Sequence, residues 1–200
     1  MRPERGTVVR LRAGDRSTAA TAAALLDREL GAGLYTAEGL LRDAADPTAG
    51  VWVADGTTVA GATLSRLLVP ADAAYYERFG PQATGIFGGT VGSFEALAVE
   101  PAARRRGLGS QLTAVSLDWM REQGCDTAIA VSWRSGRPGS SVGLFRRLGF
   151  REGPTVERFY HAESVRDGWV CPVCRGPCVC PATLFTLALA AWGGSRQVRR

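Results

Sequence analysis

The chain has 200 residues, of which 46% are hydrophobic and 22% are charged. This balance excludes an intrinsically disordered chain, and the length suits one α/β domain with a small appendage. No apolar run approaches the ~20 residues that a membrane-spanning helix needs, and the charged N-terminus does not resemble a secretory signal peptide. We therefore expect a cytoplasmic protein, in which thiols stay reduced.

All 24 basic side chains are arginines, and they are unevenly distributed. Residues 1–100 carry nine arginines and twelve Asp or Glu, whereas residues 101–200 carry fifteen arginines and seven acids. A polyanionic ligand at the second half and a cationic one near the first half would fit this distribution. A solvated surface with no steering role explains the same charges.

Strands and helices are expected to alternate along the chain. The pattern predicts a strand at 7–12, a helix at 18–30 capped by Ser17, a helix from Thr36 to about residue 45, and strands at 51–54 and 58–69 joined by a turn at Asp55-Gly56. Residues 70–90, rich in Gly, Pro and Ala, should form an ordered loop or a short helix. There follow a strand at 91–99, a helix at 108–123, a strand at 127–133, a loop at 134–140, a helix at 140–148, and strands at 155–160 and 182–189.

The most informative stretch joins a strand to a helix through a basic turn. The apolar run 96–99 stops at Glu100-Pro101, three arginines follow, and a Gly-Leu-Gly triplet at 107–109 opens the helix. The first amides of a helix have no internal partner and the helix dipole adds positive potential there, so such a turn binds anions. Glycine lets the backbone approach a bulky group closely, and the expected ligand is a diphosphate. An ordinary turn with solvated arginines is the alternative; the G-x-G-x-x-G and P-loop patterns are absent.

Residues 104–109 (RRRGLG) resemble motif A of the GNAT acetyltransferase superfamily, whose signature is Arg or Gln, two residues, Gly, one residue, then Gly or Ala. Residues 144–150 (LFRRLGF) are similar to the family's helix that ends in Leu-Gly-Phe. The resemblance covers about residues 7–160 and implies an α/β fold: a mixed, splayed central sheet flanked by helices, with the pantetheine arm of acetyl-CoA in the opening. It also implies acetyl transfer to a primary amine by direct transfer in a ternary complex.

The resemblance assigns main-chain roles to the central strand and the basic turn. Backbone groups of Val99 would hold the pantetheine arm, and the backbone amide of Leu97 would point at the thioester oxygen. The turn would hold the pyrophosphate. The cofactor-binding residues expected there are Arg104, Arg105, Arg106, Gly107, Leu108, Gly109 and Ser110.

Glu95 is the candidate general base. It lies four residues before Val99, where several GNAT enzymes carry a glutamate, and its apolar strand would raise its pKa. The alternative is a side chain that faces solvent at the open edge of the strand. At Ser93, another position from which family members act, a serine could only position water.

The general acid is where the chain departs from the family pattern. Phe145 stands where many relatives carry a tyrosine, and Pro138 stands at the usual asparagine position. The acid is either absent, since a thiolate is a tolerable leaving group, or supplied by Tyr75, Tyr76 or Tyr160, of which Tyr160 is the candidate retained.

A cysteine cluster lies outside the family pattern. Its members are Cys171, Cys174, Cys178 and Cys180. Four thiols in ten residues with a C-x2-C start indicate a metal in a reduced compartment, and zinc bound by four thiolates would form a closed structural site. A redox or disulfide pair, an iron–sulfur cluster and no metal are the alternatives. We expect residues 1–165 to form the acetyltransferase-like domain, and residues 166–200 to form the cysteine loop plus a strand that completes the sheet.

The leading interpretation is therefore a GNAT-type N-acetyltransferase that uses acetyl-CoA, carries a structural zinc ion and modifies a small-molecule or peptide amine. Two alternatives stand: a non-catalytic acyl-CoA-binding sensor or scaffold, consistent with Phe145, and a nucleic-acid-binding zinc protein. The cysteine loop argues against the latter because it holds only Arg175 and no aromatic stacking platform. The sequence leaves open the acceptor, the length of the acyl group, and a homodimer through the apolar segment 184–192.

Overall fold

The computed structural model describes residues 7–55, 58–136 and 140–195. Within these ranges, seven strands form one sheet in the order β1-β2-β3-β4-β5-β7-β6. The strands are β1 (Thr7–Arg10), β2 (Ala49–Asp55), β3 (Gly61–Leu68), β4 (Val91–Val99), β5 (Thr127–Trp133), β6 (Arg151–Val156) and β7 (Ala182–Ala188). The α-helices are α1 (Arg16–Leu30), α2 (Ala37–Ala45), α3 (Ala73–Tyr76), α4 (Pro81–Thr84), α5 (Leu108–Glu122), α6 (Val142–Arg147) and α7 (His161–Asp167).

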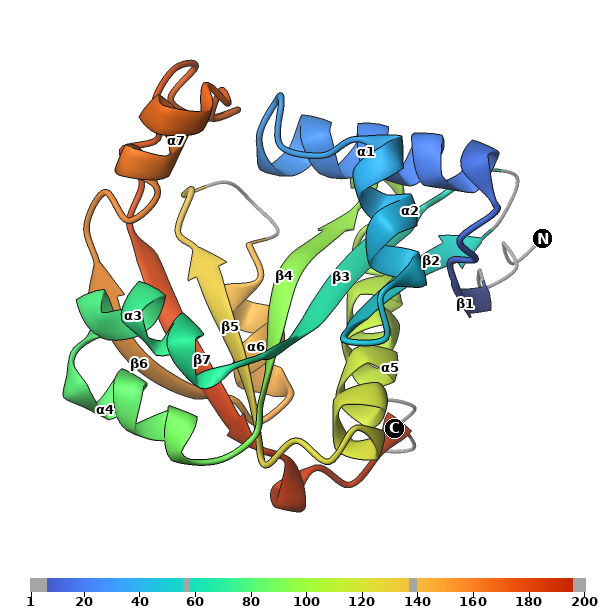
Figure 1. Ribbon diagram of the computed structural model, residues 1–200. Helices are drawn as coiled ribbons and strands as arrows, with labels where there is room; N and C mark the ends of the chain where they lie inside the picture. Colours follow the sequence, from blue (N-terminus) through green and yellow to red (C-terminus); the bar gives the residue numbers. More distant parts are fainter. Residues whose placement is uncertain (1–6, 56–57, 137–139, 196–200) are drawn as a thin grey trace.

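The sheet separates two hydrophobic clusters because successive side chains of a strand point to opposite faces. Along β2, Val51 and Val53 pack with α1 and α2, whereas Trp52 between them packs on the other face, against Trp119 of α5. Figure 1 shows this layering, with α2 in front of β3 and α5 behind the sheet.

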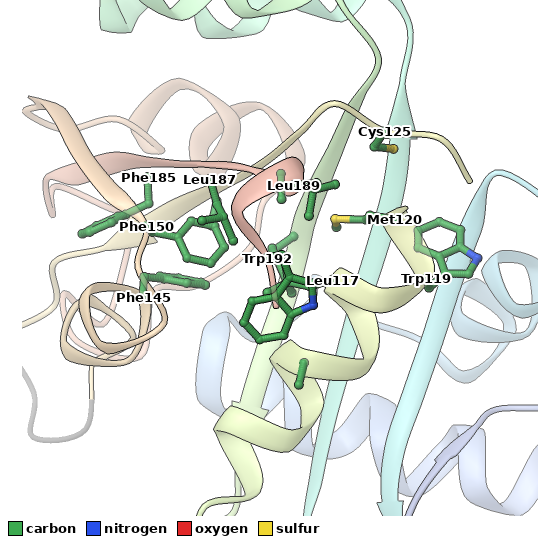
Figure 2. Packing of buried hydrophobic residues seen from close by; sticks show 14 of the residues in the cluster. Leu117, Trp119, Met120, Cys125, Phe145, Phe150, Phe185, Leu187, Leu189 and Trp192 are labelled. Carbon is green, nitrogen blue, oxygen red and sulfur yellow. The ribbon is translucent and has the colours of Figure 1, made fainter. Parts of the chain in front are cut away.

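The α5 face holds the aromatic core, which joins α5 and α6 to the last strand (Figure 2). Phe185 of β7 is fully buried, and its ring centroid lies 5.6 Å from that of Phe145 in α6. Beyond β7, the buried Trp192 donates its indole N–H to the Asp118 carboxylate of α5 at 2.8 Å. The C-terminal segment is therefore part of the core.

β4 and β5 pair in parallel over a short length and then separate. Their paired residues run from Val91 with Thr127 to Phe94 with Ala130. β4 continues to Val99 alongside β3, while β5 continues alongside β7. The two strands therefore diverge over their second halves, as Figure 1 shows, and the expected mixed, splayed sheet with a cysteine-rich insertion is confirmed.

Two local expectations are wrong. Asp15, not Ser17, caps α1, because its carboxylate accepts the amide of Thr18 at 3.1 Å and the helix already begins at Arg16. The strand expected at 155–160 lies earlier, at β6, where Pro154 occupies an edge strand beside a register shift, a position that tolerates proline.

The other expected elements concern the central strands, the segment 70–90 and two positions in loops. The strands at 91–99 and 127–133 match β4 and β5, and residues 70–90 form short helical turns. Helix α7 was not expected from the sequence. The turn residue Gly56 and the position of Pro138 lie outside the described residues.

No helix in the described ranges combines the length and the apolar character needed to cross a membrane.

We predict that Phe185→Ala lowers the free energy of unfolding by about 3–5 kcal/mol, since a fully buried ring leaves a cavity among other rings. Urea denaturation would measure the change. The control, Val165→Ala on the exposed side of α7, should change stability by less than about 0.5 kcal/mol. Equal effects of the two substitutions would contradict this description of the core.

Candidate functional site

A cleft of about 910 Å³ opens where β4 and β5 diverge. One wall is β4 from Phe94 to Val99, and one end is the basic turn with the start of α5. Further lining comes from α6 and from the segment that runs from Tyr160 to Cys178. The cleft thus brings together the basic turn, the central strand and the cysteine loop, which are far apart in the sequence.

Glu95 is the extra residue of a β-bulge. In the pairing of β3 with β4, Ser65 lies opposite Phe94 and Leu64 lies opposite Ala96, which leaves Glu95 without a partner. Phe94 and Ala96 are both buried, whereas the side chain of Glu95 is exposed within the cleft. A bulge of this kind re-aims one side chain next to a site. The sequence predicts a regular strand at 91–99, and no residue type in this strand indicates a bulge at Glu95.

The surroundings of Glu95 favour a protonatable carboxyl. Although solvent in the cleft reaches the side chain, the dense protein around it raises the pKa of Glu95 above its ordinary value, and a hydrogen bond with Ser93 opposes this rise. The hydroxyl of Tyr76 lies 3.3 Å from that of Ser93. Burial, followed by the charge of Glu95, raises the pKa of Tyr35 and Tyr76, so both phenols stay protonated.

The edge of β4 that faces the cleft carries main-chain groups that pair with no strand of the described chain, although the carbonyl of Val99 accepts a hydrogen bond from Arg104. The carbonyl of Ala96 accepts a hydrogen bond from the Thr63 hydroxyl of β3. The amide of Glu100 donates to the carbonyl of Ala60, the residue before β3, at 2.9 Å. Because main-chain groups alternate between the two edges of a strand, those of Leu97 and Val99 face away from β3. Both residues line the cleft beyond the last pairing with β5.

The basic turn forms an amide cradle. Arg105 and Gly107 have φ angles of 61° and 85°, in the left-handed region, and α5 begins at Leu108. The first backbone bond within the helix runs from the amide of Gln111 to the carbonyl of Gly107, at 3.0 Å. The amides of residues 108–110 precede it and have no helical acceptor. Alternating backbone conformations ahead of a helix N-terminus create a concave anion site, and a left-handed arginine is strain of the kind that gathers at functional sites.

The three arginines of the turn differ in their surroundings. Arg104 donates Nε–H to the carbonyl of Val99 at 2.9 Å and Nη2–H to the buried Glu29 at 2.5 Å. It therefore ties the turn to β4 and α1. Arg105 and Arg106 are exposed and form no ion pair within the described part of the chain, and Arg105 also lines the cleft. The sequence alone predicts one arginine cluster and does not distinguish these surroundings.

The candidates for the general acid lie in different surroundings. Phe145 is buried in the aromatic core, with its ring centroid 4.9 Å from that of Phe150. Tyr160 lines the cleft and donates its hydroxyl to the carbonyl of Val131 on β5 at 3.4 Å. Burial holds the pKa of Tyr160 well above its ordinary value. Tyr75 lines the cleft as well, and burial is the main cause of its raised pKa.

The four cysteines form one cluster. The ligand atoms of Cys171, Cys174, Cys178 and Cys180 all lie within 4.8 Å of one another. The sulfurs of Cys174 and Cys180 are 3.5 Å apart, well beyond the ~2.05 Å of a disulfide. Backbone amides donate to the sulfurs of Cys171 and Cys174 at 3.4 Å. Zn–S bonds of about 2.3 Å place tetrahedral sulfurs about 3.8 Å apart, so this donor set fits one soft cation.

Sequence reasoning missed the cleft residues between β6 and the cysteine loop. Glu163 and Asp167 of α7, and Trp169 after it, line the cleft. The seven residues of α7 are mostly polar and too few to show a helical period. The one available signal was Trp169, two residues before Cys171. A large aromatic side chain next to a cysteine loop is expected to pack against another part of the protein.

Comparisons with solved structures show the same fold. Arabidopsis thaliana NAA60 in complex with acetyl-CoA has a TM-score of 0.65 and 14% identity, over 92% of this chain and 99% of the other. The ribosomal-protein-S18-alanine N-acetyltransferase of Escherichia coli has a TM-score of 0.59 and 16% identity, over 92% and 94%. Drosophila melanogaster polyamine N-acetyltransferase, which forms N-acetylagmatine, has a TM-score of 0.61 and 17% identity, over 91% and 99%.

A search of curated proteins finds no match. The sequence profile described as "Acetyltransferase (GNAT) family" matches residues 21–150, a range that contains β4, the basic turn and the Leu-Gly-Phe end of α6. The chain therefore belongs to the acetyltransferase (GNAT) family.

Proposed function

We propose that this protein transfers an acetyl group from acetyl-CoA to a primary amine by direct attack within a ternary complex. The observation that carries the proposal is the continuity of one cleft, which runs from the amide cradle at α5, along the free edge of β4, to the bulged Glu95. Membership of the acetyltransferase family supports the reaction class, and the cleft supplies a place for both substrates.

The donor half of the cleft suits a long anionic thioester. The amides of residues 108–110 and the exposed Arg105 would bind the pyrophosphate, because unpaired amides and the helix dipole favour anions. The main-chain groups of Leu97 and the amide of Val99, whose carbonyl is held by Arg104, would bind the pantetheine arm in the position of a missing strand. The Leu97 amide would donate to the thioester oxygen, where negative charge develops in the transition state.

The transfer itself needs one base and a leaving group. Glu95 removes a proton from the ammonium group, the free amine attacks the thioester carbon, a C–N bond forms and the C–S bond breaks. The sulfur leaves as a thiolate and takes up a proton. Tyr160, whose phenol stays protonated in the cleft, is the proposed donor of that proton, and the second proton of the attacking nitrogen, which the amide product does not keep, restores the phenol.

The acceptor half of the cleft favours a cationic amine. Glu95, Glu163 and Asp167 line it, whereas the arginines that line the cleft, Arg104, Arg105 and Arg147, belong to the turn and α6. Glu29 also lines the cleft at the arginine end, where it is paired with Arg104. Charges of opposite sign at the two ends orient a polyanionic donor and an ammonium acceptor. Small-molecule amines and peptide N-termini both meet this requirement.

One observation favours a second candidate function. Phe145 places a buried ring where many relatives carry a tyrosine, so a sensor that binds acyl-CoA without turnover is the alternative. Acetyl-CoA binding with no product from a broad panel of primary amines would support the sensor over the enzyme.

We predict that Gly107→Ala weakens acetyl-CoA binding at least tenfold, since the left-handed cradle would have to shift to relieve the new side chain. Isothermal titration calorimetry would measure the dissociation constant. The matched control is Gly124→Ala, at the end of α5, which has a similar φ of 80° and lies outside the cleft. Both variants should lose about 1 kcal/mol of stability. Equal binding by both would remove the cradle from the proposal, and no binding by the unmodified protein would remove the proposed function.

Glu95→Gln should lower kcat by about 10²–10⁴ if Glu95 is the base. Because the pKa of Glu95 is raised and the base acts as the carboxylate, kcat/KM should fall as the pH drops through a value above the ordinary glutamate pKa of about 4.3. The variant should lose this acidic limb, whereas the control Glu122→Gln, on the exposed end of α5, should keep it. An unchanged pH profile in Glu95→Gln would assign the base elsewhere.

We also propose that the four cysteines bind one zinc ion in a structural role, because their sulfurs lie within 4.8 Å of one another and four thiolates form a closed zinc site. Native mass spectrometry should show one zinc-sized mass per chain. Cys174→Ser, which changes the least buried of the four, should lose it, and Cys125→Ser, a buried thiol outside the cluster, should keep it. A visible chromophore with iron would indicate an iron–sulfur cluster instead, and a metal-free chain lighter by two or four hydrogens would indicate disulfides.

A further inference from the structure

The segment between β6 and β7 forms the wall of the cleft that faces β4. Tyr160, Glu163, Asp167, Trp169 and Cys178 all line the cleft from this segment. Figure 1 shows α7 standing across the open end of the sheet from α1. The cysteine cluster is therefore not remote from the proposed acceptor site; one of its four members reaches the cleft directly.

This wall has very little core of its own. At its start, Phe159 is fully buried against Tyr75 and Phe79. Beyond it, the buried cluster of the segment consists of Trp169 with three cysteines, and Trp133, Tyr160 and Cys174 pack against it partly buried. Among the described residues of 157–181, none belongs to a strand of the sheet. One isolated β-bridge at Val170, the Arg78–Glu163 ion pair and a few hydrogen bonds, such as that of the Arg134 amide to the carbonyl of Pro181, join the segment to other parts of the chain. So small an apolar cluster stabilises residues 161–181 weakly, whereas a metal bound by four thiolates adds stability there, because its binding energy becomes folding energy.

One set of contacts connects the cysteines to α7. The amide of Cys178 donates to the hydroxyl of the buried Ser164 at 2.9 Å, and that hydroxyl donates to the carbonyl of His161 at 2.8 Å. The residue before Ser164 in α7, Glu163, lines the cleft and pairs with Arg78 at 2.6 Å. Cys178 is therefore hydrogen-bonded to the helix that carries this carboxylate.

A second set of contacts connects the cysteines to the loop between α1 and α2. Val170, next to Cys171, exchanges two backbone hydrogen bonds with Ala32, at 3.0 and 2.9 Å. The ring of Trp169 lies so close to Gly31 that a Cβ there would sit 2.8 Å from it. The same loop leads to Tyr35, which lines the cleft beside Glu95.

We propose that the metal bound by the four cysteines positions the acceptor-side wall of the cleft, so that metal loading controls the amine site and leaves the acetyl-CoA site unaffected. Cys171 and Cys178 are positioning residues that act through Trp169 and α7. The inference rests on the proposed function for the identity of the wall as an acceptor site. The physical claim, that the metal fixes this wall, can be tested separately.

Hydrogen exchange measured by mass spectrometry on the full chain tests that claim. Metal removal by a chelator, or Cys174→Ser, should accelerate exchange at least tenfold in residues 31–36 and 160–178 and leave the helix α5 unchanged. The dissociation constant of acetyl-CoA should change by less than about twofold, while KM for n-butylamine, used as the probe amine, should rise. Cys125→Ser is the control and should match the unmodified protein.

A variant that keeps the metal tests the same link from the other side of the cleft. Gly31→Ala should displace Trp169, because the backbone of Gly31 is extended, with a φ of 168°, and only the contact with the ring and the flexible Leu34 opposes the new side chain. It should retain zinc and accelerate exchange in residues 160–170. The matched control is Gly14→Ala, where a Cβ meets nothing within 4 Å.

The outcomes separate the two proposals. Unchanged exchange in residues 31–36 after metal loss, or an equal loss of protection in α5, would overturn the role of the metal in the wall. If metal removal unfolds the whole chain, Gly31→Ala decides, and normal exchange in that variant would overturn the link through Trp169. Failure of the metal-loaded protein to bind acetyl-CoA would overturn the proposed function, while the exchange comparison would still support or reject the wall.

Discussion

The separation of β4 from β5 determines the rest of the site. A buried strand edge with unpaired main-chain groups is costly, and proteins normally pair or solvate such groups. β5 is paired with β7 along its whole length, from Thr127 to Trp133, while β4 remains with β3 up to Val99. On the proposed function, the main-chain groups of Leu97 and the amide of Val99 on this edge would bind a ligand that carries amides of its own, as the pantetheine arm of acetyl-CoA does.

The two sides of the cleft are supported in different ways. The donor side rests on α5, whose Leu112, Leu117 and Met120 are fully buried in the aromatic core. Arg104 adds a polar link from the turn to β4 and to the buried Glu29 of α1. Beyond the buried Phe159, the segment on the acceptor side has neither a long helix nor a strand, and its buried cluster is Trp169 with three cysteines. On the proposal of a bound metal, one side is fixed by packing and the other by the metal.

Regular periodicity and local turn chemistry carried most of what the sequence could predict. β4, β5 and α5 are long elements with strong apolar patterns, and the basic turn has its own chemistry, so their positions follow from nearby residues. The bulge at Glu95 could not be predicted, because it depends on the register of β3 against β4 and not on the residues of either strand. β6 was misplaced for a related reason: Pro154 reads as a strand end unless the strand is known to lie at an edge.

On the proposed function, the bulge also explains how a carboxylate could serve as a base in an otherwise apolar strand. In a regular strand, the side chain of Glu95 would point to the face opposite to that of its two neighbours. Its charge would then be either buried or exposed to solvent on that face. As the extra residue, it leaves Phe94 and Ala96 in the core and enters a cleft whose dense walls disfavour its ionised form. Each unit of pKa shift corresponds to about 1.4 kcal/mol of preference for the neutral form, and the hydrogen bond with Ser93 reduces this preference. A bound ammonium group would reduce the preference for the neutral form further, because an opposite charge a few ångströms away favours the carboxylate. On the proposed function, the acceptor itself therefore helps to ionise the base that deprotonates it.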